Sequence, residues 1–163
     1  MEAFKHILVP TDFGEASNRA LDFALSLAGK FESKVTLMHT YTVPASGYGY
    51  PDGLLWPVDE LSKAAKKELD RALAKTKERY ANVEGVLVSG EPWQQILETA
   101  SASGADLILM GTHGRRGFSR VLLGSVAEKV VRLSPIPVLT VSSKEEQQAK
   151  EKAVAETGAT KSA

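Results

Sequence analysis

Two kinds of hydrophobic pattern alternate along this chain. Short continuous apolar runs, typical of strands buried on both faces, are separated by longer segments whose apolar residues recur every three or four positions. This alternation predicts a parallel sheet covered by helices. The runs that predict strands are 6–10, 34–40, 83–89, 106–110 and 138–141.

The helical pattern occupies the connections between these runs. It predicts helices within 15–30, near 58–80, from Pro92 to Gly104, and over 125–133. We expect Gly29 to end the first helix and Leu61 to begin the inner face of the second. The segment 44–57 holds too many glycines and prolines for regular structure. It either covers a ligand or partner surface, or is a variable surface loop.

Five strands joined by right-handed crossovers predict a doubly wound five-stranded parallel sheet of order 3-2-1-4-5, with helices on both faces. Ligands of such sheets bind at the carboxyl ends of the strands that flank the reversal of winding. Here those ends carry Pro10-Thr11-Asp12 and Gly111-Thr112-His113-Gly114. The second segment is rich in glycine, so both topology and composition indicate a ligand site there.

Length and composition limit the remaining possibilities. The 163 residues suit one domain, 1–142, followed by a polar tail, 143–163, that we expect to be disordered or a frayed helix. Twenty basic residues balance twenty acidic ones, so neither nucleic acid nor an anionic membrane is a favoured partner. Without cysteine there is no disulfide framework or thiolate zinc site. Because no apolar stretch approaches a signal peptide or a membrane span, we expect a cytoplasmic protein.

The segment 111–125 has the features of a phosphate site. Glycines let backbone N–H groups approach phosphate oxygens, and a helix that begins at Ser125 offers unpaired N–H groups and a partial positive charge. Arg115, Arg116 and Arg120 lie between and are able to neutralise phosphate. The alternative is a plain glycine turn, an ordinary helix cap and solvated arginines.

Two other nucleotide motifs are absent. The chain contains no Gly-x4-Gly-Lys-Ser/Thr loop, which argues against a P-loop NTPase. The segment 10–14 that follows the first strand lacks the glycine cluster of a dinucleotide-binding fold.

The motifs that remain resemble the universal stress protein family from about Lys5 to Val141. They are Ile7 to Phe13, Leu37-Met38-His39, Gly90-Glu91-Pro92, Asp106 to Gly114 and Gly124 to Glu128. The spacing Gly-x2-Gly-x9-Gly-Ser is similar to that of the ATP-binding branch of the family.

This resemblance implies roles for individual residues. Asp12, the only acid at the predicted crevice, would lie near the ribose or phosphates; the alternative is that its carboxylate caps the following helix. The backbone of Thr40 (often valine in the family) would contact adenine, and Mg²⁺ would be held mainly by the phosphates. His113 is either a phosphate contact or an exposed loop residue, and we expect His39 to be a hydrogen-bonded core residue. The implied cofactor-binding residues are Pro10, Thr11, Asp12, Thr40, Met110, Gly111, His113, Gly114, Arg115, Gly117, Gly124, Ser125 and Val126.

The resemblance also implies a homodimer formed through the exposed edge of the strand 138–141. The expected function is that of an adenine-nucleotide-binding regulator of the stress response, read by a downstream protein not identified by the sequence. The alternatives are a slow ATPase or another nucleotide-handling enzyme, for which Asp12, His113 and the loop arginines are the available groups, and a relative that has shifted to another small ligand.

Overall fold

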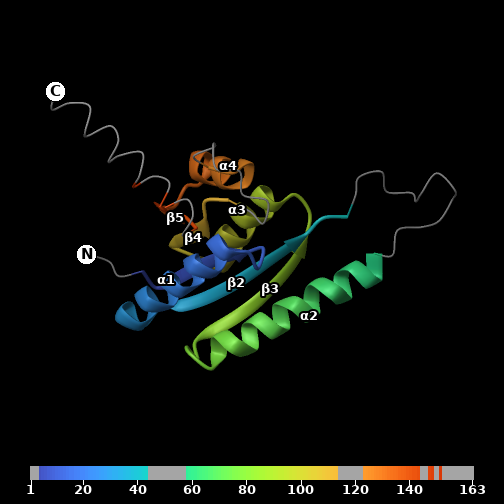
Figure 1. The fold of residues 1–163 in the computed structure, drawn as a ribbon, viewed down its shortest axis with the longest axis horizontal. Coiled ribbons are helices and arrows are strands. Elements are labelled where there is room, and N and C mark those ends of the chain that lie inside the picture. The colour runs from blue at the N-terminus through green and yellow to red at the C-terminus, as the bar shows by residue number, and fades with distance from the viewer. Residues whose placement is uncertain (1–3, 44–57, 114–122, 144–146, 149–150, 152–163) are drawn as a thin grey trace, which may run out of the picture.

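The computed structural model describes residues 4–43, 58–113, 123–143, 147–148 and 151, and the predictions for 44–57 lie outside these residues. Figure 1 shows the arrangement of the helices and strands. In chain order they are β1 (His6–Thr11), α1 (Glu15–Phe31), β2 (Lys34–Tyr41), α2 (Val58–Lys77), β3 (Val83–Ser89), α3 (Pro92–Ser103), β4 (Leu107–Gly111), α4 (Ser125–Leu133) and β5 (Val138–Val141).

The predicted fold is confirmed. Five parallel strands form one sheet in the order β3-β2-β1-β4-β5. The chain winds from β1 to one edge, returns through α3, and continues to the other edge. Among the residues that the structure describes, no helix combines the length and apolar character that crossing a membrane requires.

The sheet has a hydrophobic core on each face. Along β1, Ile7 and Val9 pack with α1 and α2, while Leu8 packs with α3 and α4, and all three side chains are fully buried. This alternation follows from the period of two along a strand. Figure 1 shows α3 and α4 side by side, with α2 lying along β2 and β3.

Several predicted boundaries are wrong by one to three residues. Gly29 does not end α1, which runs on to Phe31; Glu32 ends it in a left-handed conformation, and its N–H group donates to Ala28 O. Helix α2 ends at Lys77, and Leu61 in its first turn, on the same face as the buried Ala65 and Leu69, is 37% exposed.

Strand boundaries shift for local reasons. Strand β4 begins at Leu107, one residue later than predicted, although the Asp106 N–H group still donates to His6 O at 3.0 Å and its carboxylate accepts the Lys5 N–H group at 2.7 Å. β1, β2 and β4 each extend one residue further than predicted at their carboxyl ends. The extra residues, Thr11, Tyr41 and Gly111, lie at the edge where the ligand site is predicted.

Polar side chains join the strands at the opposite, amino-terminal end of the sheet. His6 Nε2 lies 2.7 Å from Thr36 Oγ1, and Thr36 donates to Glu84 Oε1 at 2.9 Å. Lys34 binds the same carboxylate at 2.8 Å, and this hydrogen bond holds the pKa of Glu84 below its usual value. These groups satisfy one another across three strands, so this end of the sheet has a structural role.

Gly111 brings α1 against the end of β4. A Cβ atom at this position would lie 2.9 Å from the backbone carbon and the Cβ of Ala16 and from the Ser17 nitrogen. Such contacts are closer than real Cβ atoms allow, so any side chain here must push α1 off the sheet. The glycine thus serves helix packing, in addition to its place beside the predicted ligand.

We predict that Gly111→Ala lowers the free energy of unfolding by about 2 kcal/mol, because the new methyl group meets backbone and not a flexible side chain. Urea unfolding monitored by circular dichroism measures this change.

Gly29→Ala is the matched control. Gly29 lies in α1, the helix that packs against Gly111, and a Cβ atom at Gly29 would meet nothing within 4 Å. It should stabilise the protein by about 0.5–1 kcal/mol. If both variants unfold at the wild-type urea concentration, the packing argument for Gly111 is wrong.

Candidate functional site

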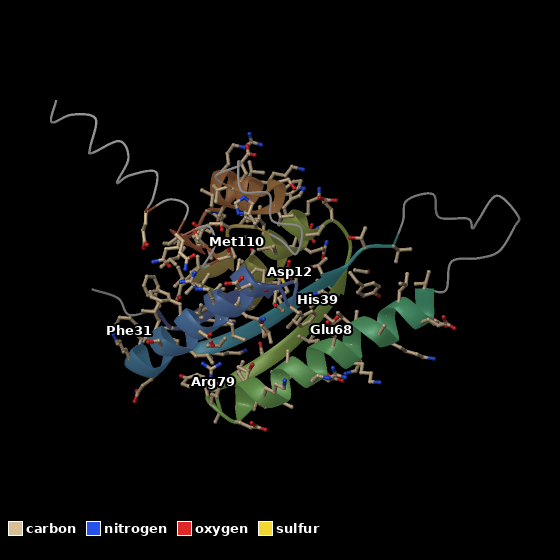
Figure 2. All side chains as sticks on the ribbon, viewed as in Figure 1. Asp12, Phe31, His39, Glu68, Arg79 and Met110 are labelled. Atoms are coloured by element: carbon tan, nitrogen blue, oxygen red, sulfur yellow. The ribbon has the colours of Figure 1, made fainter. Side chains whose placement is uncertain are left out.

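A cavity of about 640 Å³ lies at the carboxyl ends of β1, β2 and β4, on the sheet face covered by α3 and α4. Figure 2 places Asp12, His39 and Met110 at this end, away from Phe31 and Arg79. Pockets for small molecules commonly enclose about 300–1,000 Å³. The position is the one expected from the reversal of winding between β1 and β4.

Every predicted site residue that the structure describes lines this one cavity. They are Pro10, Thr11, Asp12, Thr40, Met110, Gly111, His113, Gly124, Ser125 and Val126. Gly114, Arg115 and Gly117, together with Arg116 and Arg120, lie outside the described residues. His113, for which simple exposure was one alternative, is half-buried.

Further lining residues were not among the predicted cofactor-binding residues, although Thr112 lies in the predicted ligand segment. They are Ser17, Met38, His39, Pro92, Ile96, Thr112, Leu123, Ala127 and Glu128. Most of these residues have the sequence pattern of core positions. A buried side chain can belong to the core and still form part of the cavity wall, so the pattern does not separate the two. The expectation that Asp12 is the only acid in the crevice is wrong: Glu128, one turn into α4, also lines the cavity, and its carboxylate lies 3.9 Å from Arg132.

The cavity floor is apolar. Pro10, Met38 and Met110 come from three neighbouring strands and occupy the same sheet face as Leu8 and Ile108. Ile96 of α3 adds a further apolar wall. A flat apolar group therefore fits this floor, with polar groups of the loops around it.

The Asp12 carboxylate lines the cavity and also accepts hydrogen bonds from nearby residues of the chain. Its Oδ1 atom accepts the Gly14 N–H group at 2.9 Å and the Ser17 hydroxyl at 2.7 Å. Both possibilities raised by the sequence are therefore present in one residue: the carboxylate stabilises the entry into α1 and lines the cavity.

The turn that carries Asp12 is strained and strongly hydrogen-bonded. Phe13 adopts a left-handed conformation, with φ of 63°, which costs a bulky residue on the order of 1–3 kcal/mol. The Thr11 hydroxyl accepts the Phe13 N–H group at 2.9 Å and donates to Ser17 Oγ at 3.2 Å. Because Ser17 is buried, these hydrogen bonds fix the turn on the side that faces the protein interior.

His39 was expected in the core. The structure confirms its hydrogen bond, from Nδ1 to the Thr11 carbonyl at 2.8 Å, but places the residue half-buried at the cavity. It thereby ties the end of β2 to the end of β1.

Gly124 serves the packing of the loop against α4. Its φ of −69° and ψ of 160° are open to any residue, but a Cβ would lie 3.3 Å from Thr112 O. The Gly124 N–H group donates to the same oxygen at 2.7 Å, and the Thr112 N–H group donates to Val141 O at 2.9 Å. The start of α4 is thus fastened to β4 and β5.

The first turn of α4 faces the cavity with unpaired helix amides. Gly124 caps the helix without a side-chain hydrogen bond, and its carbonyl accepts the N–H group of Glu128. The N–H groups of Ser125 and Val126 precede the first intrahelical bond, as in any α-helix. Such a helix end attracts anions. Within the described part of the chain, no group of three or more acidic or histidine side chains is arranged to hold a metal ion.

Comparison with known proteins gives a family match. The model of the family described as "Universal stress protein family" matches residues 3–142. The chain is 38% identical over 144 residues to Universal stress protein MJ0531 of Methanocaldococcus jannaschii, covering 85% of this chain and 82% of that protein.

Solved structures give the same result. The structure of MJ0577, another universal stress protein of Methanocaldococcus jannaschii, superposes with a TM-score of 0.73 at 29% identity and covers 88% of this chain and 99% of that one. A universal stress protein in complex with cAMP superposes with a TM-score of 0.64 at 28% identity, covering 88% of this chain and 100% of the other.

We predict that Ser17→Ala destabilises the protein by about 1–2 kcal/mol, because it removes the hydroxyl that joins Thr11 to Asp12 inside the protein. Urea unfolding gives the measurement. Ser101→Ala, at an exposed position of α3, is the control and should leave stability unchanged or slightly raised. Equal stability of the two variants would show that the Ser17 hydrogen bonds add nothing.

Proposed function

This chain belongs to the universal stress protein family, and we propose that it binds an adenine nucleotide in the cavity at the carboxyl ends of β1, β2 and β4. The observation that carries the proposal is the meeting, in one cavity, of an apolar floor, the Asp12 carboxylate and the amino terminus of α4. A relative of similar fold has been solved with cAMP, which contains the same base.

The cavity residues suit the parts of such a ligand. The apolar floor beside Met38 and Met110 accepts the flat face of adenine, with the backbone of Thr40 at its edge. Asp12 is placed for a ribose hydroxyl, since a carboxylate accepts hydrogen bonds from hydroxyl groups. The amides of Ser125 and Val126 are donors for phosphate oxygens.

We propose ATP as the working ligand, on the spacing of Gly111, Gly114, Gly124 and Ser125. A divalent cation such as Mg²⁺ would be bound mainly by the phosphates, with Asp12 and Glu128 as the carboxylates of the described cavity lining. In this proposal Gly114, Arg115 and Gly117 complete the phosphate site.

The proposed role is regulatory: a nucleotide-bound, cytoplasmic homodimer whose state is read by a downstream protein during stress. Asp12 Oδ1 already accepts two hydrogen bonds from its own chain. A carboxylate engaged in this way suits holding a ligand better than removing a proton from water. This favours a binding module over a hydrolytic enzyme.

The phosphate part of the proposal is tested at Ser125. Ser125→Pro removes the first N–H group of α4 without breaking the helix, because proline is well tolerated at the first helical position and Gly124 already has the extended conformation that precedes proline. Ser125→Ala removes only the hydroxyl. In calorimetric titrations of ligand-free protein with ATP and Mg²⁺, we expect Ser125→Pro to bind about tenfold more weakly than Ser125→Ala, the worth of one charge-assisted hydrogen bond.

Parallel titrations with AMP and cAMP identify the preferred nucleotide. Equal affinities of the two Ser125 variants would show that the phosphates do not bind at the amino terminus of α4. Absence of saturable binding of all three nucleotides to the wild type would refute the proposed function.

The proposed dimer uses the open edge of β5. In the described sheet, β5 pairs only with β4, through Pro137 O and Val141 O, which accept N–H groups of β4 and its following loop. Since backbone groups alternate along a strand, those of Val138 and Thr140 point to the open edge. The adjacent helix α4 exposes Val131 and Leu133, 43% and 49% respectively.

Thr140→Pro removes an N–H group from the open edge and none from the pairing with β4. We expect the wild type to have a dimeric mass in light scattering at micromolar concentration, and Thr140→Pro a monomeric mass with retained circular dichroism. A monomeric wild type, or a dimeric and folded Thr140→Pro, would rule out pairing through β5.

A further inference from the structure

The hydrogen bond of His39 fixes which ring nitrogen carries the proton. Nδ1 lies 2.8 Å from the carbonyl oxygen of Thr11, and a carbonyl oxygen only accepts hydrogen bonds. Nδ1 is therefore the donor, and the neutral ring has its proton on Nδ1. This hydrogen bond joins β2 to Thr11, which is the last residue of β1 and the first of the turn 11–14.

The ring of His39 lies behind the cavity floor. Along β2, Leu37 packs in the core beside α1 and α2, whereas Met38 packs in the core beside α3 and α4. Because side chains alternate, His39 shares the face of Leu37. There its ring meets Phe13, with ring centroids 4.5 Å apart and planes inclined by 46°. Phe13 packs against that same core.

Phe13 in turn determines where Asp12 lies. Its left-handed backbone, with φ of 63°, reverses the chain between β1 and α1. A bulky residue keeps this conformation only when its surroundings hold it. The His39 ring holds the Phe13 side chain, and the Thr11 hydroxyl holds the Phe13 N–H group at 2.9 Å. Asp12 lies between these two fixed residues.

We infer that His39 is a positioning residue of the nucleotide site: it holds Thr11 and Phe13 from the α1 and α2 face so that Asp12 lines the cavity on the other. This inference rests on the proposed function, since it assigns His39 a part in the same site. Although His39 also lines the cavity, we assign its ring this role through Thr11, Phe13 and Asp12 and not through contact with the nucleotide.

A double-mutant cycle tests this relation. Calorimetric titration with ATP and Mg²⁺ is carried out on the wild type, His39→Ala, Asp12→Ala and the double variant. We expect His39→Ala to weaken binding about tenfold in the wild-type background, within the range of coupling between residues that share contacts. In the Asp12→Ala background the same change should alter binding less than about twofold.

His39→Asn provides a rescue, because its side-chain amide nitrogen occupies the place of Nδ1 and can donate to Thr11 O. We expect it to recover part of the affinity lost in His39→Ala. Equal losses in the two backgrounds of the cycle would mean that His39 acts independently of Asp12; the inference then fails while the proposed function stands. If the wild type binds no nucleotide, both fail.

A second measurement stands even where a variant does not fold. Nitrogen-15 NMR of the wild-type histidine rings distinguishes the two tautomers. We expect neutral His39 to carry its proton on Nδ1, the less common form in free histidine. A proton on Nε2 alone would exclude the hydrogen bond to Thr11 O and overturn the inference.

Discussion

Strand β1 is paired on both sides and buried on both faces, and the sheet extends from it in two directions. Towards β2 the crossover helix α1 covers one face, and the path through α3 to β4 covers the other. Right-handed crossovers require this exchange of faces when the winding reverses. At the carboxyl ends of β1 and β4 the two loops therefore diverge, and the cavity occupies the space between them.

Periodicity and the rules of strand connection predicted the five strands, their order and the location of the cavity, because each depends on patterns many residues long. Boundaries were less accurate, since they depend on single contacts such as the hydrogen bond from the Glu32 N–H group to Ala28 O at the end of α1. The left-handed Phe13 gives no sequence signal, because that conformation normally calls for glycine. Ser17 and His39 were missed as cavity residues because Ser17 lies within a predicted helix and His39 was assigned to the core.

The two glycines that drew attention to the site have packing roles in this structure. Gly111 allows α1 to approach β4, and Gly124 lies close to the Thr112 carbonyl. Neither role conflicts with a ligand, because close approach of helix, loop and strand is what brings the Ser125 amide beside the ends of the strands. Sequence alone does not separate these two reasons for a glycine, since both forbid a Cβ at the same place.

The cavity joins two separate stretches of the chain: Asp12 and Thr40 belong to the β1–β3 part, Met110 and Ser125 to the β4–β5 part. A ligand held there bridges both parts and binds only when they are assembled. By mass action, a free ligand at one hundred times its dissociation constant adds about 2.7 kcal/mol to the stability of the folded chain. The lifetime of this protein against cellular proteolysis would then rise and fall with the supply of its ligand.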